Sequence, residues 1–408
     1  MEYSLVSLAD CCVIKPPKAE ARAVLKPDDL VSFVPMDSLG INKKVLKLEK
    51  TRALADVSGS YTYFAENDVL LAKITPCFEN GKLGIATGLT NGIGFGSSEF
   101  IVFRPNEHLN SEYLYYFLNQ PSFRDAGQAV MTGAVGHKRV PKDFIQATQI
   151  PLPPIPEQQR IVAILDQAFA DIEKARANAE KNLKNARELF DSYLNQVFSQ
   201  RGEGWVESEL FEHTKFIDYR GKTPNKTGEG LRLITAKNVR MGYLKKMPEE
   251  FVSPDSYDEW MTRGVPEKGD ILFTTEAPLA NVAQLDTSEK VVFAQRIITM
   301  QPNRSVLDDV FLKYLLMSQP VQERILKKGT GATVTGIKAS LLKKILIQFP
   351  STLSEQRRHA DTLDILGHKV NRLKSTCEAK LNSLDELKKS LLQKAFSGEL
   401  TKDKGIAA

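Results

Sequence analysis

The residues of this 408-residue chain that are best suited to chemistry lie in short loops that combine glycine with cations and hydroxyls. The most complete of these loops has an arginine for guanine edges, an asparagine for adenine edges, lysines for phosphates and an aromatic ring. The residues concerned are Tyr219, Arg220, Lys222, Thr223, Asn225 and Lys226. This composition indicates contact with DNA, although solvated turns contain the same residue types.

Two further loops occur at equivalent places in the two halves of the chain, because Thr132-Gly133-Ala134 returns as Thr330-Gly331-Ala332. Both loops are built largely of small residues, which would let a phosphate backbone approach closely. The cations that we expect to contact phosphates there are Lys138, Arg139 and Lys338. Their repeated placement strengthens the prediction of DNA contact for this pair of loops.

Motifs for catalysis are missing from the sequence. It contains no Gly-x-x-x-x-Gly-Lys-Ser/Thr phosphate loop and no Asn/Asp-Pro-Pro-Tyr/Phe tetrapeptide, which is typical of amino-methylating DNA enzymes. The segment from Gly92 to Gly96 lacks the spacing of a dinucleotide fingerprint and is predicted to be a flexible turn before a strand. The five histidines and four cysteines show no metal-site spacing. We therefore expect no catalytic residue, no metal and no cofactor, and interpret the chain as a binder.

Two long segments, residues 151–200 and 349–398, repeat one pattern and must position these loops. Each segment opens with proline or a capping serine and ends just before glycine, as helix termini prefer. The matching markers are Glu157-Gln158-Gln159-Arg160 with Glu355-Gln356-Arg357-Arg358, Asp166 with Asp364, and Phe198-Ser199 with Phe396-Ser397. The pattern predicts two helices, each on the order of 60 Å long.

Apolar residues in both segments follow a heptad stripe with one stutter at the same place, interrupted only by His359 and Lys388. A stripe this narrow needs a partner. The second globular region begins at Trp205, directly after the first helix, so we expect it at the far end of that helix. The second helix leaves this same region and must lie back along the first helix to bury its stripe. We therefore predict that the two helices pair antiparallel within one chain. The alternatives are that each helix packs on its own globular region, or that the helices join two chains. The charged outer faces, which include Lys181 and Arg187, are either solvated or receive partner helices.

The fold class predicted is α+β, with two globular α/β regions at residues 1–150 and 201–348. They are separated by long helices at residues 151–200 and 349–408, and the whole has a pseudo-twofold plan. Strands are expected at residues 68–71, 100–103, 270–273 and 297–300, and helices at residues 112–119 and 310–318, each ended by a proline.

Composition sets only loose bounds on function. The net charge of +5 permits nucleic-acid binding without arguing for it. No run of eighteen apolar residues exists, and the first residues contain neither a basic nor an apolar signal region. We therefore expect a cytoplasmic protein that does not bind a membrane.

The order of two dissimilar globular regions and two similar long helices resembles the specificity subunit of type I restriction-modification systems. The most specific elements of this resemblance are the duplicated Glu-Gln-x-Arg helix starts and the loop from Tyr219 to Pro224. The resemblance implies two target recognition domains, each reading one half of a split sequence in double-stranded DNA, with the paired helices setting the gap. It also implies that two adenine-methylating subunits dock on those helices, and that separate restriction subunits carry the motor and nuclease.

Within that resemblance, Arg220 and Asn225 are candidates for base edges, and Lys138, Arg139, Lys222, Lys226 and Lys338 for phosphates. The first globular region has no counterpart in sequence of Arg220-Gly221-Lys222-Thr223-Pro224, so a base-reading role cannot be mirrored onto it. The competing interpretation is a coiled-coil scaffold that joins protein partners without DNA specificity.

Overall fold

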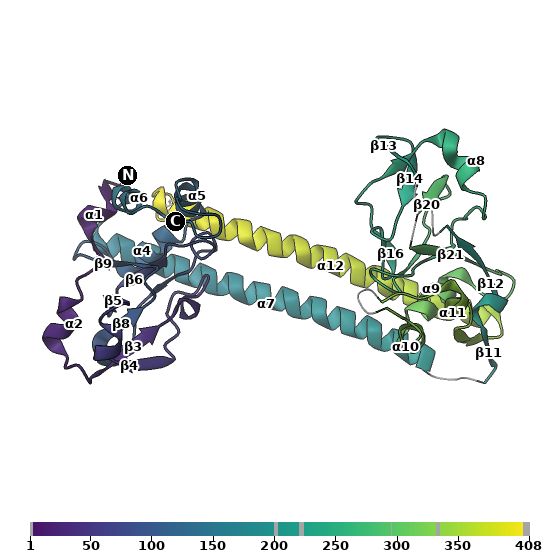
Figure 1. Cartoon of the computed structure of the whole chain (residues 1–408), viewed down its shortest axis with the longest axis horizontal. Helices are drawn as coiled ribbons and strands as arrows, with labels where there is room; N and C mark the ends of the chain where they lie inside the picture. The colour runs from purple at the N-terminus through teal and green to yellow at the C-terminus, as the bar shows by residue number, and fades with distance from the viewer. Residues whose placement is uncertain (1–2, 200–202, 220–223, 295, 332–334, 403–408) are drawn as a thin grey trace, which may run out of the picture. The chain divides into compact units, whose positions relative to one another are not determined.

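A computed structural model gives the structure of the chain and describes residues 3–199, 203–219, 224–294, 296–331 and 335–402 (Figure 1). The chain forms two compact units. Unit 1 comprises residues 1–179 and 379–408, and unit 2 comprises residues 180–378. Each unit contains one globular region and about half of each long helix. The boundaries between the units therefore lie within the long helices, whereas the domains predicted from the sequence treat each long helix as one segment.

The two long helices are α7, Ile155–Ser199, and α12, Leu353–Phe396. Every position of the predicted stripe is buried or half-buried in both helices, including His359 and Lys388. In unit 1, the carboxylate of Glu173 lies 3.9 Å from the ammonium of Lys388, and Arg176 forms an ion pair with Asp385. Residue numbers rise along α7 as they fall along α12, so the helices are antiparallel in unit 1.

In unit 2 the other halves of the same helices pack together. A Cβ atom added to Gly367 of α12 would lie 3.5 Å from the ring of Phe190 of α7. The end of α7, with Leu194 and Phe198, shares one apolar core with Leu363 near the start of α12. The predicted antiparallel pairing within one chain is therefore confirmed.

The globular part of unit 1 contains two four-stranded sheets, with strand orders β2-β9-β6-β7 and β4-β3-β8-β5, and a two-stranded pair β1-β10. The strands are β1 (Leu5–Ser7), β2 (Cys12–Ile14), β3 (Leu30–Val34), β4 (Lys50–Ala53), β5 (Thr62–Ala65), β6 (Val69–Ala72), β7 (Leu83–Ile85), β8 (Ile93–Gly96), β9 (Phe100–Pro105) and β10 (Gln149–Pro151). The helices are α1 (Leu8–Cys11), α2 (Ala19–Val24), η1 (Met36–Ser38), α3 (Leu54–Val57), η2 (Thr90–Gly92), α4 (Ser111–Leu118), α5 (Pro121–Ala129) and α6 (Lys142–Ala147).

Unit 2 repeats the first sheet and the two-stranded pair of unit 1 as β12-β21-β18-β19 and β11-β22. Its second sheet has a different strand order, β13-β17-β14-β20, and it has a further pair, β15-β16. The strands are β11 (Trp205–Glu209), β12 (Thr214–Asp218), β13 (Lys226–Thr227), β14 (Leu231–Ile234), β15 (Val239–Arg240), β16 (Tyr243–Leu244), β17 (Phe251–Val252), β18 (Ile271–Thr274), β19 (Val282–Gln284), β20 (Val291–Phe293), β21 (Ile297–Pro302) and β22 (Leu346–Pro350). The helices are η3 (Leu210–Glu212), η4 (Pro254–Ser256), α8 (Tyr257–Trp260), α9 (Asp309–Met317), α10 (Gln319–Lys327) and α11 (Ala339–Lys343).

The four strands and two globular helices expected from the sequence are present as β6, β9, β18, β21, α4 and α9. The prolines at positions 121 and 320 do end these helices, but each also lies in the first turn of the next helix, where a missing N–H costs nothing. The prediction of a flexible turn at Gly92–Gly96 was wrong, because Ile93–Gly96 is the buried strand β8.

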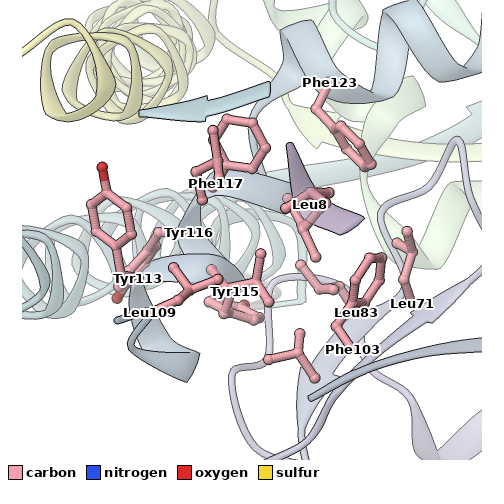
Figure 2. Packing of buried hydrophobic residues seen from close by; sticks show 14 of the residues in the cluster. Leu8, Leu71, Leu83, Phe103, Leu109, Tyr113, Tyr115, Tyr116, Phe117 and Phe123 are labelled. Carbon is pink, nitrogen blue, oxygen red and sulfur yellow. The ribbon is translucent and has the colours of Figure 1, made fainter. Parts of the chain in front are cut away.

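The core of unit 1 joins the globular region to the long helices. Figure 2 shows Tyr113, Tyr116 and Phe117 of α4 gathered with apolar residues of the first sheet. The same cluster contains Leu165 of α7 and Phe396 of α12. Helix α4 thus packs on the sheet and on both long helices. Among the described residues, no helix combines the length and the apolar character needed to cross a bilayer.

Candidate nucleic-acid interface

A buried glutamine fixes the start of α7 to the globular region of unit 1. The side-chain amide of Gln158 donates hydrogen bonds to the carbonyl oxygens of His108 and Pro153, both at 2.8 Å. Its carbonyl oxygen accepts from the backbone N–H of Asn110, also at 2.8 Å. The side chain is fully buried, so these three bonds replace all contact with water.

The start of α12 is fixed in the same way in unit 2. Gln356 is fully buried, donates to the carbonyl oxygens of Val306 (2.9 Å) and Pro350 (2.8 Å), and accepts from the N–H of Asp308 (2.8 Å). The repeated Glu-Gln-x-Arg motif is therefore a structural anchor that holds each globular region on its helix. The sequence marks the repeat but does not reveal these partners.

The repeated aspartates form a second anchor. Asp166 accepts hydrogen bonds from Lys44, at 2.8 Å, and from Tyr116. Asp364 accepts from Lys313 (2.8 Å) and Tyr314 (2.9 Å). Desolvation alone would raise the pKa of Asp364, but the bond to Lys313 and its charge outweigh it and lower that pKa.

A cavity of about 460 Å³, which we name the unit 1 groove, opens beside β2, β5 and α6. The cations in its lining, which we name the groove's rim, are Lys15, Lys18, Lys73, Arg139 and Lys142. Its apolar floor consists of Ile14, Pro16, Phe100, Ile101, Val140 and Ile145, and Tyr61, Thr62, Tyr63, Ser60 and Ser98 complete the lining. No carboxylate lines the groove among the described residues.

Glu99, close to the groove, compensates part of this charge. Its carboxylate accepts two hydrogen bonds from the guanidinium of Arg139, at 2.9 and 2.8 Å, and lies 4.0 Å from the ammonium of Lys73. The bond from Arg139 lowers the pKa of Glu99, which stays a carboxylate. Lys15 and Lys142 are exposed and have no carboxylate within 4.0 Å among the residues that the structure describes. Most of the groove's positive charge is therefore uncompensated.

Arg139 and Lys138 lie at the end of a predicted small-residue loop. Thr132 and Arg139 exchange backbone hydrogen bonds of 3.1 and 2.8 Å, and in unit 2 Thr330 and Gly336 do the same at 2.8 and 2.9 Å. Both loops are thus closed in the same way. Lys138 is exposed, and its carbonyl oxygen accepts from Thr75.

The other predicted loop lies in unit 2, and the structure describes only part of it. The ring of Tyr219 is buried and stacks on Trp260, with 6.5 Å between ring centroids. Its hydroxyl donates to the carbonyl oxygen of Gly264 (2.7 Å) and accepts from the N–H of Arg263 (2.9 Å). Tyr219 therefore presents no aromatic face to solvent and instead anchors the start of the loop.

The remaining predicted residues of unit 2 are exposed where they are described. Asn225 is exposed, and Lys226 in β13 lies 2.8 Å from the carboxylate of Glu250. Lys338 is exposed at the N-terminal end of α11. Three predicted residues, Arg220, Lys222 and Thr223, lie outside the described residues. No group of three or more His, Cys, Asp or Glu side chains in the described part of the chain could hold a metal ion.

Comparison with known proteins gives a consistent result. The family model described as "Type I restriction modification DNA specificity domain" matches residues 38–181 and 204–383. The chain is 35% identical over 189 residues to the Escherichia coli type I restriction enzyme EcoAI specificity subunit, covering 45% of this chain and 32% of that protein. It is 32% identical over 220 residues to the EcoEI specificity subunit of the same organism, covering 52% and 36%. The match thus spans about a third of these two relatives.

Other relatives match along nearly the whole chain. The MjaVIII specificity subunit of Methanocaldococcus jannaschii is 23% identical over 421 residues, covering 98% of this chain and 93% of that protein. The crystal structure of the HsdS subunit from Thermoanaerobacter tengcongensis has a TM-score of 0.63 at 21% identity and covers 98% and 97% of the two chains. A chain from a structure on complex assembly and conformational transition of the type I R-M system has a TM-score of 0.76 at 22% identity, covering 98% of each chain. These two structures share the fold.

Proposed function

This chain belongs to the type I restriction modification DNA specificity family, and we propose that it selects the DNA sequence on which the other subunits of such a system act. The observation that carries the proposal is the partly duplicated fold: each unit has one four-stranded sheet of the same strand order, the same glutamine anchor and a loop closed in the same way, with different side chains. Two similar frames with different surfaces suit two different DNA half-sites, and each unit reads one of them.

Within the reading surfaces, cations fix the register of the protein on the phosphates, and a few polar side chains read bases. We assign phosphates to Lys138, Arg139, Lys222, Lys226 and Lys338. Arg220 and Asn225 are the candidates for base edges, because arginine pairs with guanine and asparagine with adenine in the major groove. Tyr219 fixes the chain directly before Arg220 through its buried ring, and Thr223 adds a hydroxyl for a phosphate or base edge.

The paired helices α7 and α12 set the spacer between the half-sites in this proposal. DNA repeats every ~34 Å along its axis, so two separated reading surfaces meet the duplex in different turns and leave unread base pairs between them. The charged outer faces of the helices receive two adenine-N6-methylating subunits, and restriction subunits join through these. The methylating subunits extrude the target adenine into their own pockets. The support for these partners is the family membership and the names of the relatives.

Mapping modified adenines in DNA methylated by the assembled complex tests the proposal. We expect a split site, with two specified tracts separated by unspecified base pairs. A single continuous site would refute division of the reading between units. Modification without any sequence preference would instead favour the scaffold interpretation.

Two substitutions in the loop of unit 2 separate base reading from phosphate contact. Arg220→Ala should relax the preference at one base pair of one half-site and weaken specific binding by ~1–3 kcal/mol. Lys222→Ala is the matched comparison. It should weaken binding to all duplexes alike and make the slope of log Kobs against log salt shallower by about 1. A uniform loss with Arg220→Ala would make this arginine a phosphate contact.

A further inference from the structure

The unit 1 groove raises the question of what its uncompensated cations bind. We propose that it is the DNA-contacting surface of unit 1, with Lys15, Lys18 and Lys142 on backbone phosphates. This inference rests on the proposed function and deepens it, because the sequence assigns no base-reading loop to the first globular region.

The first four-stranded sheets of the two units pair their edge strands in a similar register. In unit 1, β2 pairs with β9 so that Cys12 lies opposite Pro105. In unit 2, β12 pairs with β21 so that Thr214 lies opposite Pro302. Both strands are the edge of the same four-strand order, so the residues that directly follow β2 correspond in register to the end of β12.

The segment that follows β2 can therefore be compared along the chain with the sequence that follows β12. The segment Lys15-Pro16-Pro17-Lys18 directly follows β2, and in the sequence of unit 2 β12 is followed by Tyr219 and Arg220–Pro224. Both segments carry two cations and at least one proline within a few residues. The sequence that follows the edge strand is therefore cationic in both units.

The small-residue loop of residues 132–139 ends at the same groove, because Arg139 lines it. The N–H of Val140 bonds the carbonyl oxygen of Lys73 (3.0 Å), and the equivalent N–H of Ile337 bonds Thr275 (2.9 Å). This bond holds Arg139 on the groove's rim, with Lys142 beyond it. Two features that the sequence treats separately, the segment after β2 and the loop of residues 132–139, thus lie on one surface.

The groove also concentrates positive charge. Five cations line the groove, and Glu99 pairs with Arg139 at 2.8 Å and lies near Lys73 at 4.0 Å. The pKa of Lys18 is lowered, first by desolvation and then by repulsion from Arg22 and Lys15. Cations that destabilise one another in the free protein are stabilised by a polyanion, and clefts lined by one sign of charge concentrate such a partner.

The backbone at the rim is also unusual. Lys15 has φ +61°, in the left-handed region that non-glycine residues seldom adopt, while its N–H bonds the carbonyl oxygen of Val102 at 2.8 Å. Strained residues of this kind cluster at binding sites, where the surrounding structure holds them. Lys15 lines the groove and is exposed, and no carboxylate of the described residues lies within 4.0 Å of its ammonium.

The test removes two exposed charges without touching the core. The variant Lys15→Gln/Lys142→Gln is compared with Lys26→Gln/Lys50→Gln, which removes the same charge from exposed lysines of unit 1 that do not line the groove. Each full chain is assembled with its methylating subunits and bound to a duplex carrying the mapped site at several salt concentrations. For the groove variant, the slope of log Kobs against log salt should become shallower by about 2, and the control should keep the wild-type slope.

The outcomes separate this inference from the proposed function. If the wild type prefers its site but the groove variant keeps the wild-type slope, or both variants lose slope equally, the groove inference is overturned and the proposed function stands. If the wild type binds all duplexes alike, the proposed function fails and the groove inference fails with it.

Discussion

Replacing the buried glutamine of the first anchor should loosen the joint between α7 and its globular region. Gln158→Leu keeps nearly the same volume but leaves the carbonyls of His108 and Pro153 and the N–H of Asn110 without their partner. The bond to the Pro153 carbonyl is buried, and a buried unpaired group costs ~1–3 kcal/mol. The other two groups are partly buried, where water replaces part of the bond, at ~0.5–1 kcal/mol each. Together these costs lower the local stability of the joint by about 3 kcal/mol.

Hydrogen exchange of the full chain measures this loss locally. The amides of α4 and of the first turns of α7 should exchange about 100-fold faster in Gln158→Leu, since 1.4 kcal/mol corresponds to a factor of ten. Gln159→Leu is the matched control, because Gln159 is exposed in the same helical turn and its replacement should change stability by less than ~0.5 kcal/mol.

The comparison refutes the reasoning if Gln158→Leu exchanges no faster than Gln159→Leu. A loss spread evenly over both units would also contradict it, because the three partners of Gln158 all lie in unit 1.

Further predictions concern the polar groups on the long helices. Asp364→Asn should destabilise unit 2 by about 2 kcal/mol in denaturant titrations at pH 7, because it leaves the ammonium of Lys313, whose side chain is only 9% exposed, without its carboxylate partner. The loss is smaller than for a fully buried ion pair, because the side chain of Asp364 is 38% exposed and water screens the interaction. Since the pKa of Asp364 is lowered in the folded state, this contribution is complete above the unfolded value of about 3.9 and is lost as pH falls through the folded pKa. The difference between wild type and variant should therefore shrink below about pH 4, and a constant difference would exclude the ion pair as its source. Lys388→Met should stabilise unit 1 by about 1 kcal/mol, because it replaces a half-buried ammonium on the apolar stripe with an apolar side chain. Burial lowers the pKa of Lys388, and its ammonium lies 3.9 Å from the carboxylate of Glu173, too far for a strong ion pair. A lower unfolding midpoint than that of the wild type would contradict this.

The sequence predicted the parts of the fold that depend on local periodicity. The heptad stripe fixes which faces of α7 and α12 are buried, so even Lys388, which breaks the stripe chemically, keeps its half-buried position. The Glu-Gln-x-Arg motif marks both helix starts, because it recurs within the first turns of α7 and α12. Its glutamine could not be recognised as an anchor, because the partners at His108 and Asn110 come from a distant part of the chain.

The prediction failed where a tertiary contact decides a residue's role. Glycines at 94 and 96 were taken for flexibility, but a Cβ at Gly94 would lie 2.1 Å from the ring of Phe64, and one at Gly96 would lie 2.5 Å from the carbonyl oxygen of Val34. These glycines permit close packing of a strand. Likewise, the cations of the unit 1 groove are scattered in sequence and gather only when β2, β6 and α6 come together.

The central claim, that two similar units each read one half of a divided site, is tested most directly by hydroxyl-radical footprinting of the assembled complex on its mapped sequence. The account predicts two protected tracts separated by nucleotides whose sugars remain accessible to cleavage. One unbroken protected tract, or protection that does not depend on sequence, would contradict it.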